Sequence, residues 1–234
     1  MTCNDLSQKI PTGCRTIDEF LKGGLPVEGV ILVYGEAETG KTTLAMQCAT
    51  NCARLGFKTL FVDSDRTFSA RRLSQIAAEQ FQAIAEMIIL ARPNNFEEQT
   101  LIVDQSNDFV NKNFKLVVFD TVTSLYRLKI SESPSKTFEL NRELNRQLAV
   151  LAQMARTQKI TLLLTSQVHS VLNEAPISIE PVATRVLRFW ADIVVAMKLT
   201  ENPQIINATV EKNPEKLPPI ACDLKIEETG IHET

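Results

Sequence analysis

The clearest chemistry in the chain lies at Gly35 to Thr42, GEAETGKT, which fits GxxxxGK[ST] between an apolar stretch and a predicted helix. Glycines at both ends let the backbone wrap an anion, and the amides that open the helix point toward it. We therefore predict a phosphate-binding loop in which Lys41 reaches the β- and γ-phosphates, Thr42 ligates Mg²⁺, and Glu36 and Glu38 face solvent. A loop that no longer binds nucleotide is the alternative, and the presence of both Lys41 and Thr42 disfavours it. The predicted nucleotide-binding residues here are Gly35, Glu36, Ala37, Glu38, Thr39, Gly40, Lys41, Thr42 and Thr43.

Acidic groups end two further apolar stretches. LVVFD ends at Asp120, roughly 80 residues after the phosphate-binding loop, and a carboxylate in that place orients Mg²⁺. TLFVDSDRTF crowds Asp63, Asp65 and Arg66 into one polar turn after a predicted strand. We expect ATP and Mg²⁺ as cofactors, with Thr42 and Asp120 as the metal-binding residues.

Composition excludes several classes of protein. The formal net charge is −3, from 25 basic and 28 acidic residues, so any contact with DNA must come from local basic patches. Five cysteines without a CxxC pair predict neither disulfides nor structural zinc, and Cys48 and Cys52 are expected to be small core residues. The chain shows no signal peptide and no apolar run near the ~18 residues of a membrane span, so we expect a cytoplasmic protein without membrane partners.

Five apolar stretches alternate with helical patterns, which is typical of a parallel sheet covered on both faces. After Asp192 three strands without helices predict an antiparallel extension at the carboxyl end. The predicted fold class is α/β in one domain, mostly a parallel sheet flanked by helices. Helices are expected from about residue 16 and over 41–56, 70–85, 97–110 and 137–159, and loops over 127–136, 169–185 and 212–219.

Several segments in order resemble the cores of the archaeal RadA and bacterial RecA recombinases. They are VILVYGEAETGKTTLAMQCA, VVFDTVTSLYR, LLLTSQV, RFWADIVVAMKL and ACDLKIEETGI, and the resemblance runs from about Thr12 to Ile231. It implies a RecA-like P-loop NTPase core over residues 12–234 after a short tail, residues 1–11. RadA has a helical DNA-binding domain before this core, and a linker whose aromatic residue docks on the next subunit; neither is expected here. A chain of this kind resembles the RadA paralogs of the RadB or RadC type.

The resemblance implies a DNA-repair and recombination helper that assists a RadA-type recombinase on single-stranded DNA. Its enzyme activity would be weak, DNA-dependent ATP hydrolysis, and homo-oligomers are possible. A KaiC-like regulatory ATPase that acts through protein partners without DNA is the alternative from another class. A scaffold in which nucleotide only locks an interface is a third reading.

Catalytic residues follow from the same resemblance. Family members end the second strand with DTEGTF, so Asp65 takes the place of the water-orienting Glu and Arg66 that of the Gly. The Asp65 carboxylate is roughly 1.5 Å shorter, which predicts slow hydrolysis unless the backbone has shifted to compensate. Lys41 and Gln167 complete the catalytic set, Gln167 as the sensor of the γ-phosphate or else as a buried, hydrogen-bonded residue. Arg72 is expected to stack on adenine, the alternative being a solvated helix residue.

Two segments match the family's DNA-binding loops, and the candidate DNA contacts are Arg127, Lys129, Lys136, Arg185 and Arg188. Their charge is partly offset by glutamates, so DNA affinity should be weak and salt-sensitive, and the alternative is an ordinary charged surface. Tyr126 is the one aromatic residue near the first segment. Lys212 matches a region that contacts a neighbour's ATP, so it is a candidate to act in trans; otherwise it is a hairpin lysine in water.

Overall fold

The computed structural model describes residues 8–171, 178–181 and 183–234. A sheet lies at its centre, in the strand order β10-β9-β8-β7-β1-β5-β4-β2-β3, with β6 paired to β5. The strands are β1 (Val30–Gly35), β2 (Lys58–Asp63), β3 (Ile88–Ala91), β4 (Phe114–Asp120), β5 (Thr161–Val171), β6 (Ser178–Pro181), β7 (Ile193–Leu199), β8 (Ile205–Lys212), β9 (Ile220–Glu227) and β10 (Gly230–Glu233).

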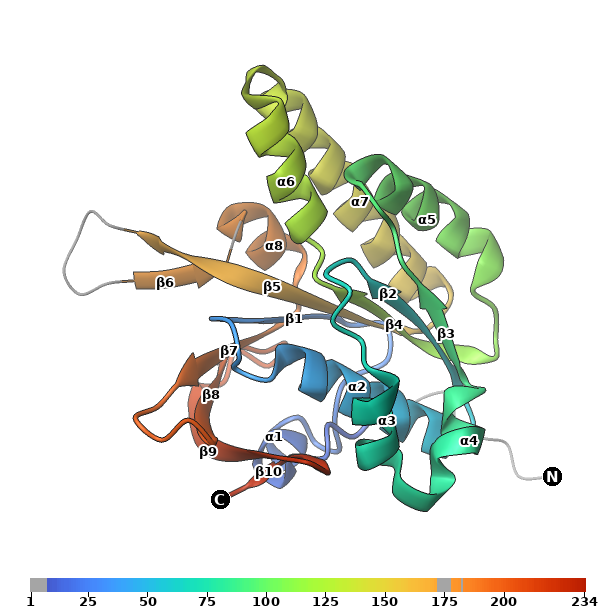
Figure 1. Cartoon of the computed structure of the whole chain (residues 1–234), viewed down its shortest axis with the longest axis vertical. Helices are drawn as coiled ribbons and strands as arrows, with labels where there is room; N and C mark the ends of the chain where they lie inside the picture. Colours follow the sequence, from blue (N-terminus) through green and yellow to red (C-terminus); the bar gives the residue numbers. More distant parts are fainter. Residues whose placement is uncertain (1–7, 172–177, 182) are drawn as a thin grey trace.

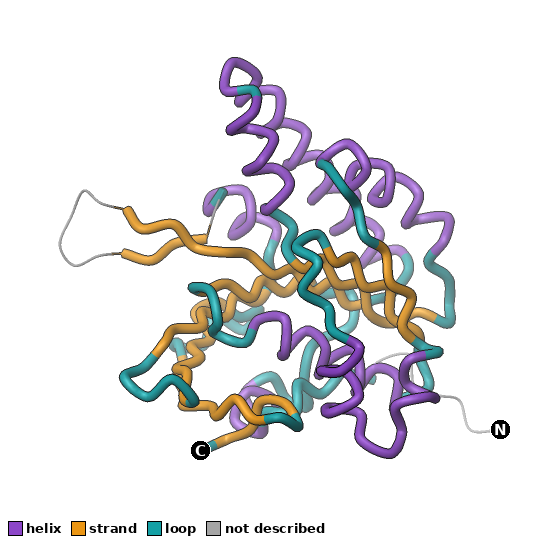
Figure 2. Tube along the Cα trace, viewed as in Figure 1, coloured by secondary structure: helices purple, strands orange, loops and turns teal. Residues whose placement is uncertain are grey.

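Helices cover both faces of the sheet (Figures 1 and 2). One face packs on the first group, α1 (Arg15–Phe20), α2 (Lys41–Arg54), α3 (Ala70–Ala77) and α4 (Phe81–Ala85). The other packs on α5 (Phe96–Phe109), α6 (Ser124–Glu132), α7 (Thr137–Thr157) and α8 (Thr184–Trp190). Each face has its own apolar core, which explains why β1 and β4 are buried along their whole lengths. This confirms the predicted α/β fold.

The strands β7, β1, β5, β4, β2 and β3 run parallel to one another. The prediction for the carboxyl-terminal part is corrected in two ways. Strand β7 joins the parallel block beside β1, so the antiparallel extension begins only with β8, and a fourth strand, β10, follows β9. Cys48 and Cys52 are buried core residues, as expected.

Both predicted DNA loops contain regular structure. Residues 124–132 form α6 because Leu125 and Tyr126 pack into the core, and Pro134 opens a short 3₁₀ helix, η2 (Pro134–Lys136), where its missing N–H costs nothing. The second segment holds the end of β5, then β6 and α8. The prediction of a loop was wrong for these described parts.

Two boundaries also differ from the predictions. The helix expected over 70–85 breaks at Ala78, whose positive φ of 51° separates α3 from a 3₁₀ turn, η1 (Ala78–Gln80), and α4. Ile10 is 1% exposed and pairs with Leu25, so the core already includes residues before Thr12. Among the described residues, no helix is both long and apolar enough to cross a membrane.

Candidate nucleotide site and nucleic-acid interface

Strand register gathers the predicted catalytic residues at one edge of the sheet. Gly35 at the end of β1 pairs with Gln167 on β5, and Asp63 at the end of β2 pairs with Asp120 on β4. The carboxyl ends of neighbouring parallel strands meet there, which is where α/β sheets bind their ligands. The sheet therefore brings together the groups that the sequence places far apart.

The phosphate-binding loop has the backbone its motif requires. Gly40 has a φ of 83° and precedes α2, whose first amides face the loop. A Cβ on Gly35 would lie 2.2 Å from the Met197 carbonyl oxygen, so this position requires glycine. Glu38 is exposed as predicted, and Glu36 is half-buried.

Lys41 lies within this loop rather than in solvent. Its ammonium donates to the Glu36 carbonyl and, at 3.3 Å, to Thr39 Oγ1. Burial lowers the pKa of Lys41, while the nearby Asp120 and Asp65 carboxylates oppose that shift. The Lys41 ammonium is mostly removed from water, and oxygens of the loop hold it in place. Such a cation can form strong contacts with phosphate oxygens.

The residues beside the loop fit a magnesium ion. Thr42 Oγ1 donates to Asp120 Oδ2 at 2.8 Å, and Thr67 Oγ1 lies 3.3 Å from the same oxygen. Thr165 donates to Asp120 Oδ1 at 2.5 Å, which fixes the carboxylate. Burial raises the pKa of Asp120, while the hydrogen bonds from Thr165 and Thr42 lower it. No cluster of three or more His, Cys, Asp or Glu residues is present in the described chain, and Mg²⁺ binding at Thr42 and Asp120 stays a prediction.

The two carboxylates of the acidic turn after β2, Asp63 and Asp65, have different surroundings. Asp63 is fully buried and accepts hydrogen bonds from the amides of Thr67, at 2.9 Å, and Phe68, at 3.3 Å. Its other contact is an ion pair with Arg92 at 3.0 Å. Asp63 therefore holds the shape of the turn and leaves Asp65 as the candidate for orienting water.

Asp65 belongs to a short chain of polar contacts. Gln167 Nε2 donates to Asp65 Oδ2 at 3.4 Å, and Gln167 Oε1 accepts from an Arg127 guanidinium N–H at 3.2 Å. Arg127 lies on α6, so one amide side chain links the candidate catalytic carboxylate to the helix that follows β4. Gln167 is thus hydrogen-bonded at both ends of its amide, and its role as the sensor of the γ-phosphate stays a prediction.

A buried network that the sequence did not suggest supports the same turn. Ser64 Oγ donates to Gln99 at 3.3 Å, and the Gln99 amide donates to the Val122 carbonyl at 3.2 Å and to Gln147 at 3.0 Å. Gln99 and Gln147 are both fully buried. Polar residues on the inner face of a predicted helix are the only signal that could have indicated them.

Arg72 and Lys212 both have partners within the chain. Arg72 donates to the Glu228 carbonyl at 2.9 Å, beside the turn between β9 and β10, so stacking on adenine stays a prediction. The Lys212 ammonium donates to the carbonyls of Arg188, at 3.1 Å, and Ala191, and so caps the end of α8. Lys212 is nevertheless exposed at the end of β8, as the reading of a hairpin lysine expects, and its action in trans stays a prediction.

The five candidate DNA contacts do not form one cationic patch. Lys129 pairs with Glu97 at 2.7 Å, and Arg188 pairs with Glu211 at 2.5 Å and donates to the Tyr34 hydroxyl at 3.1 Å. These two side chains are thus held by acidic partners within the chain. The remaining three are all exposed: Arg127, Lys136 and Arg185.

Aromatic residues near these segments differ from the expectation. Tyr126 is 5% exposed and packs against Phe96, with ring centroids 5.9 Å apart, so it offers no open face. Phe138 and Phe189, which the sequence reading missed, are 78% and 74% exposed. Phe138 lies off the apolar stripe of α7, and this was the available signal for its exposure.

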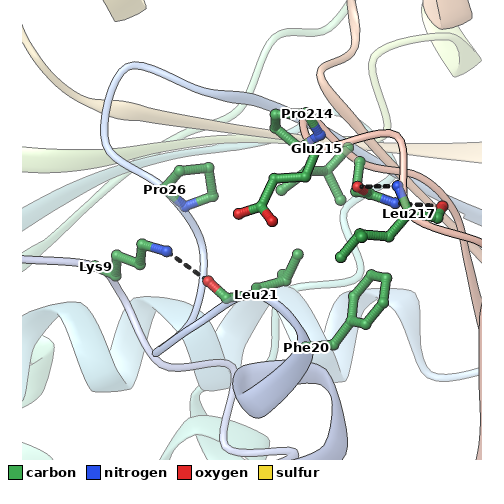
Figure 3. Close-up of a pocket in the computed structure, with 9 residues that line it drawn as sticks. Lys9, Phe20, Leu21, Pro26, Pro214, Glu215 and Leu217 are labelled. Carbon is green, nitrogen blue, oxygen red and sulfur yellow. Dashed lines mark hydrogen bonds between the residues drawn. The ribbon is translucent and has the colours of Figure 1, made fainter.

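A separate hollow lies at the opposite end of the sheet, where β7 begins (Figure 3). Phe20, Leu21 and Leu217 line it, and the Lys9 ammonium donates to the Leu21 carbonyl at 2.5 Å. Its few polar groups serve the junction between α1 and the turn after β8. It contributes nothing to the phosphate-binding edge.

Comparisons with known proteins agree with this architecture. A family model described as Rad51 matches residues 6–234. The DNA repair and recombination proteins RadB of Methanothermobacter thermautotrophicus and Methanosphaera stadtmanae are 30% and 27% identical, and the matches cover 96% and 98% of this chain and 96% and 99% of theirs. The crystal structure of the RadB recombinase superposes with a TM-score of 0.82 at 30% identity, covering 96% of this chain and 99% of that one. This chain therefore belongs to the Rad51 family of DNA repair and recombination proteins, and its relatives there include RadB.

Proposed function

We propose that this protein is an ATP- and Mg²⁺-binding recombination accessory factor that hydrolyses ATP slowly and assists a RadA-type recombinase on single-stranded DNA. The observation that carries the proposal is the meeting of Lys41, Thr42, Asp120, Asp65 and Gln167 at one sheet edge. These groups supply phosphate contacts, a metal position, a carboxylate for water and a sensor amide.

Slow turnover follows from the position of Asp65. Its carboxylate is one methylene shorter than the glutamate of the family turn, and Gln167 already occupies one of its oxygens. A water molecule must be oriented within about 1 Å for an effective attack on phosphorus, so both features reduce the rate rather than the binding of ATP. ATP then serves chiefly as a ligand that sets the state of the Gln167 contacts.

An open sheet edge supports a recombinase partner. Strand β3 ends the sheet, and beside it lies an apolar pocket. An extended segment with an apolar side chain fits such an edge, since main-chain hydrogen bonds and a side-chain pocket act together there. The family resemblance provides that segment in the linker of RadA. The pocket is lined by Leu60, Ile89, Ala91, Ile102, Gln105, Ser106 and Phe109.

Nucleotide binding is tested with Lys41→Ala. The variant should bind ATP about 100-fold more weakly in a titration with a fluorescent ATP analogue, because a charge-assisted phosphate contact is worth up to ~3 kcal/mol. Lys112→Ala, at an exposed lysine just before β4 and so at the opposite end of the sheet, is the matched control and should bind like the parent protein. Equal affinities of the two variants would refute a functional phosphate-binding loop.

The partners are tested in the same preparation. Binding of labelled single-stranded DNA is measured with and without ATP, and again after a RadA-type recombinase is added. ATP-dependent association with DNA or the recombinase is the expected result. ATP hydrolysis without either contact would support a regulatory ATPase of the KaiC-like type. The ion pairs that Lys129 and Arg188 make within the chain would help to explain that result, because they neutralise two of the candidate DNA contacts.

A further inference from the structure

Helices α7 and α8 carry two pairs of the same composition. On α7, Phe138 and Arg142 are four residues apart, and on α8 Arg185 and Phe189 have the same spacing. Side chains at that separation lie on one face of a helix. All four residues are exposed, and Phe138 and Phe189 are the two most exposed large apolar side chains in the described chain.

One hydrogen bond joins the two pairs into a single surface. Asn145, seven residues after Phe138 and so on the same face of α7, accepts from Trp190 Nε1 at 2.9 Å. The Phe189 ring meets the Trp190 ring edge-on, with centroids 5.1 Å apart and planes at 88°. The α7–α8 platform is thus Phe138, Arg142, Trp190, Phe189 and Arg185.

We propose that the α7–α8 platform binds single-stranded nucleic acid by stacking bases on Phe138 and Phe189, with Arg142 and Arg185 contacting the backbone. This proposal rests on the proposed function and names where its DNA is held. Binders of single strands combine a basic track with aromatic faces, because every base has a face that can stack.

Two observations favour nucleic acid over a protein partner. The aromatic rings are separated by polar and basic side chains, Asn141, Arg142 and Asn145, instead of forming one continuous apolar patch. The competing acid on this stretch, Glu143, is held by Arg146 through its own ion pair at 2.7 Å, and Glu139 is the acid that remains exposed. The platform is therefore locally basic on a chain of net charge −3.

The dimensions suit a few nucleotides. From Phe138 to Asn145 the helix rises about 10 Å, which is close to three steps of a stacked strand at ~3.4 Å each. The platform also adjoins both segments that resemble DNA-binding loops, since α7 follows α6 and η2, and α8 follows β6 (Figure 1). A strand that leaves those segments meets the platform next.

The test measures binding of fluorescein-labelled oligo(dT) by anisotropy, with the full chain and ATP. Phe138→Ala and Phe189→Ala should each weaken binding about 5- to 100-fold, the range for losing one stacked base. Phe138→Trp should restore binding and Phe138→Leu should not, which separates stacking from simple apolar contact. Leu101→Ala, at a leucine 57% exposed on α5 and outside the pocket beside β3, is the matched control. Thermal unfolding and ATP binding establish that each variant is folded.

Trp190 provides an independent readout because it is the chain's single tryptophan. Its fluorescence should fall as bases approach the platform, at the same DNA concentrations that raise the anisotropy. DNA binding by anisotropy without a fluorescence change, or with unaltered affinity in both alanine variants, would overturn the platform while leaving the proposed function intact. Loss of recombinase association with unchanged DNA binding would assign the surface to a protein instead. No DNA binding by the parent protein would refute both.

Discussion

The phosphate-binding edge has two halves, and they differ in how closely their residues match the ones that binding and hydrolysis of a nucleotide require. The binding half, around Lys41, Thr42 and Asp120, has the motif residues in place and tight contacts such as the 2.8 Å bond from Thr42 to Asp120. The hydrolysis half, around Asp65 and Arg66, has a shorter carboxylate and an arginine whose φ is 56°. A site can thus preserve nucleotide binding while its power to cleave the nucleotide is reduced.

The hydrogen bonds that hold the carboxylates of the two halves, Asp120 and Asp65, differ as well. Asp120 is buried and its carboxylate receives bonds from three threonines, whereas the Asp65 carboxylate has, among the described residues, one long hydrogen bond, from Gln167 at 3.4 Å. Gln167 in turn depends on Arg127, an exposed residue of α6. The hydrolysis half is therefore linked to α6 through Gln167 and Arg127, whereas the three threonines hold Asp120 at the sheet edge itself.

The largest expected effect comes from Asp120→Asn in the binding half. The variant should lose the Mg²⁺ dependence of ATP binding and reduce turnover by about 100-fold or more, because the metal no longer has its carboxylate. A metal titration of ATP affinity checks this result. Unchanged Mg²⁺ dependence would mean that the metal is held elsewhere.

Asp120→Asn should also change the stability of the nucleotide-free protein, and this change is a gain although activity is lost. Since burial raises the pKa of Asp120, its contribution to folding is full below about pH 3.9 and is lost as the pH rises through the folded value. Removing the charge should therefore raise the melting temperature of the nucleotide-free protein at pH 7, and the gain should shrink toward pH 4. Asp108→Asn, at an exposed position on α5, should show no such trend.

A smaller effect is expected in the hydrolysis half. Asp65→Glu restores the missing methylene, so single-turnover hydrolysis of ATP should rise about tenfold while ATP affinity stays constant. Asp108→Glu, a glutamate introduced at an exposed site, controls for the change of residue type. Absence of any gain would show that the backbone of the turn already compensates for the shorter side chain.

Sequence reasoning succeeded where the signal is local. The loop Gly35–Thr42 and the strand end at Asp120 each carry their chemistry within a few residues, and apolar strands alternating with helices predict the parallel sheet. The family resemblance added Asp65 and Gln167; strand register brings Gln167 to the edge, and the turn after β2 brings Asp65 within 3.4 Å of it. These parts required no knowledge of distant contacts.

Long-range pairings account for what the sequence did not reveal. The partner of Arg188 is Glu211, and Lys212 caps the helix that contains Arg188, so two candidate functional residues prove to hold α8 in place. Gln99 and Gln147 are 48 residues apart and meet only after α5 and α7 pack together. The segment 127–136 was expected to be a loop, yet it holds most of α6, and Pro134 opens a 3₁₀ turn after it.

The smallest effect is expected from Arg66, the residue after Asp65. Arg66 holds a left-handed conformation, at a cost of ~1–2 kcal/mol that glycine avoids in part, so Arg66→Gly should raise the melting temperature by about 2 °C. Lys159, after α7, has nearly the same φ of 55°, and Lys159→Gly should give a similar gain far from the site. If the length of the side chain at 65 limits hydrolysis, Arg66→Gly changes turnover less than about threefold and adds little to Asp65→Glu. A larger increase in turnover from Arg66→Gly than from Asp65→Glu would move the cause of slow hydrolysis from the missing methylene to the strained turn.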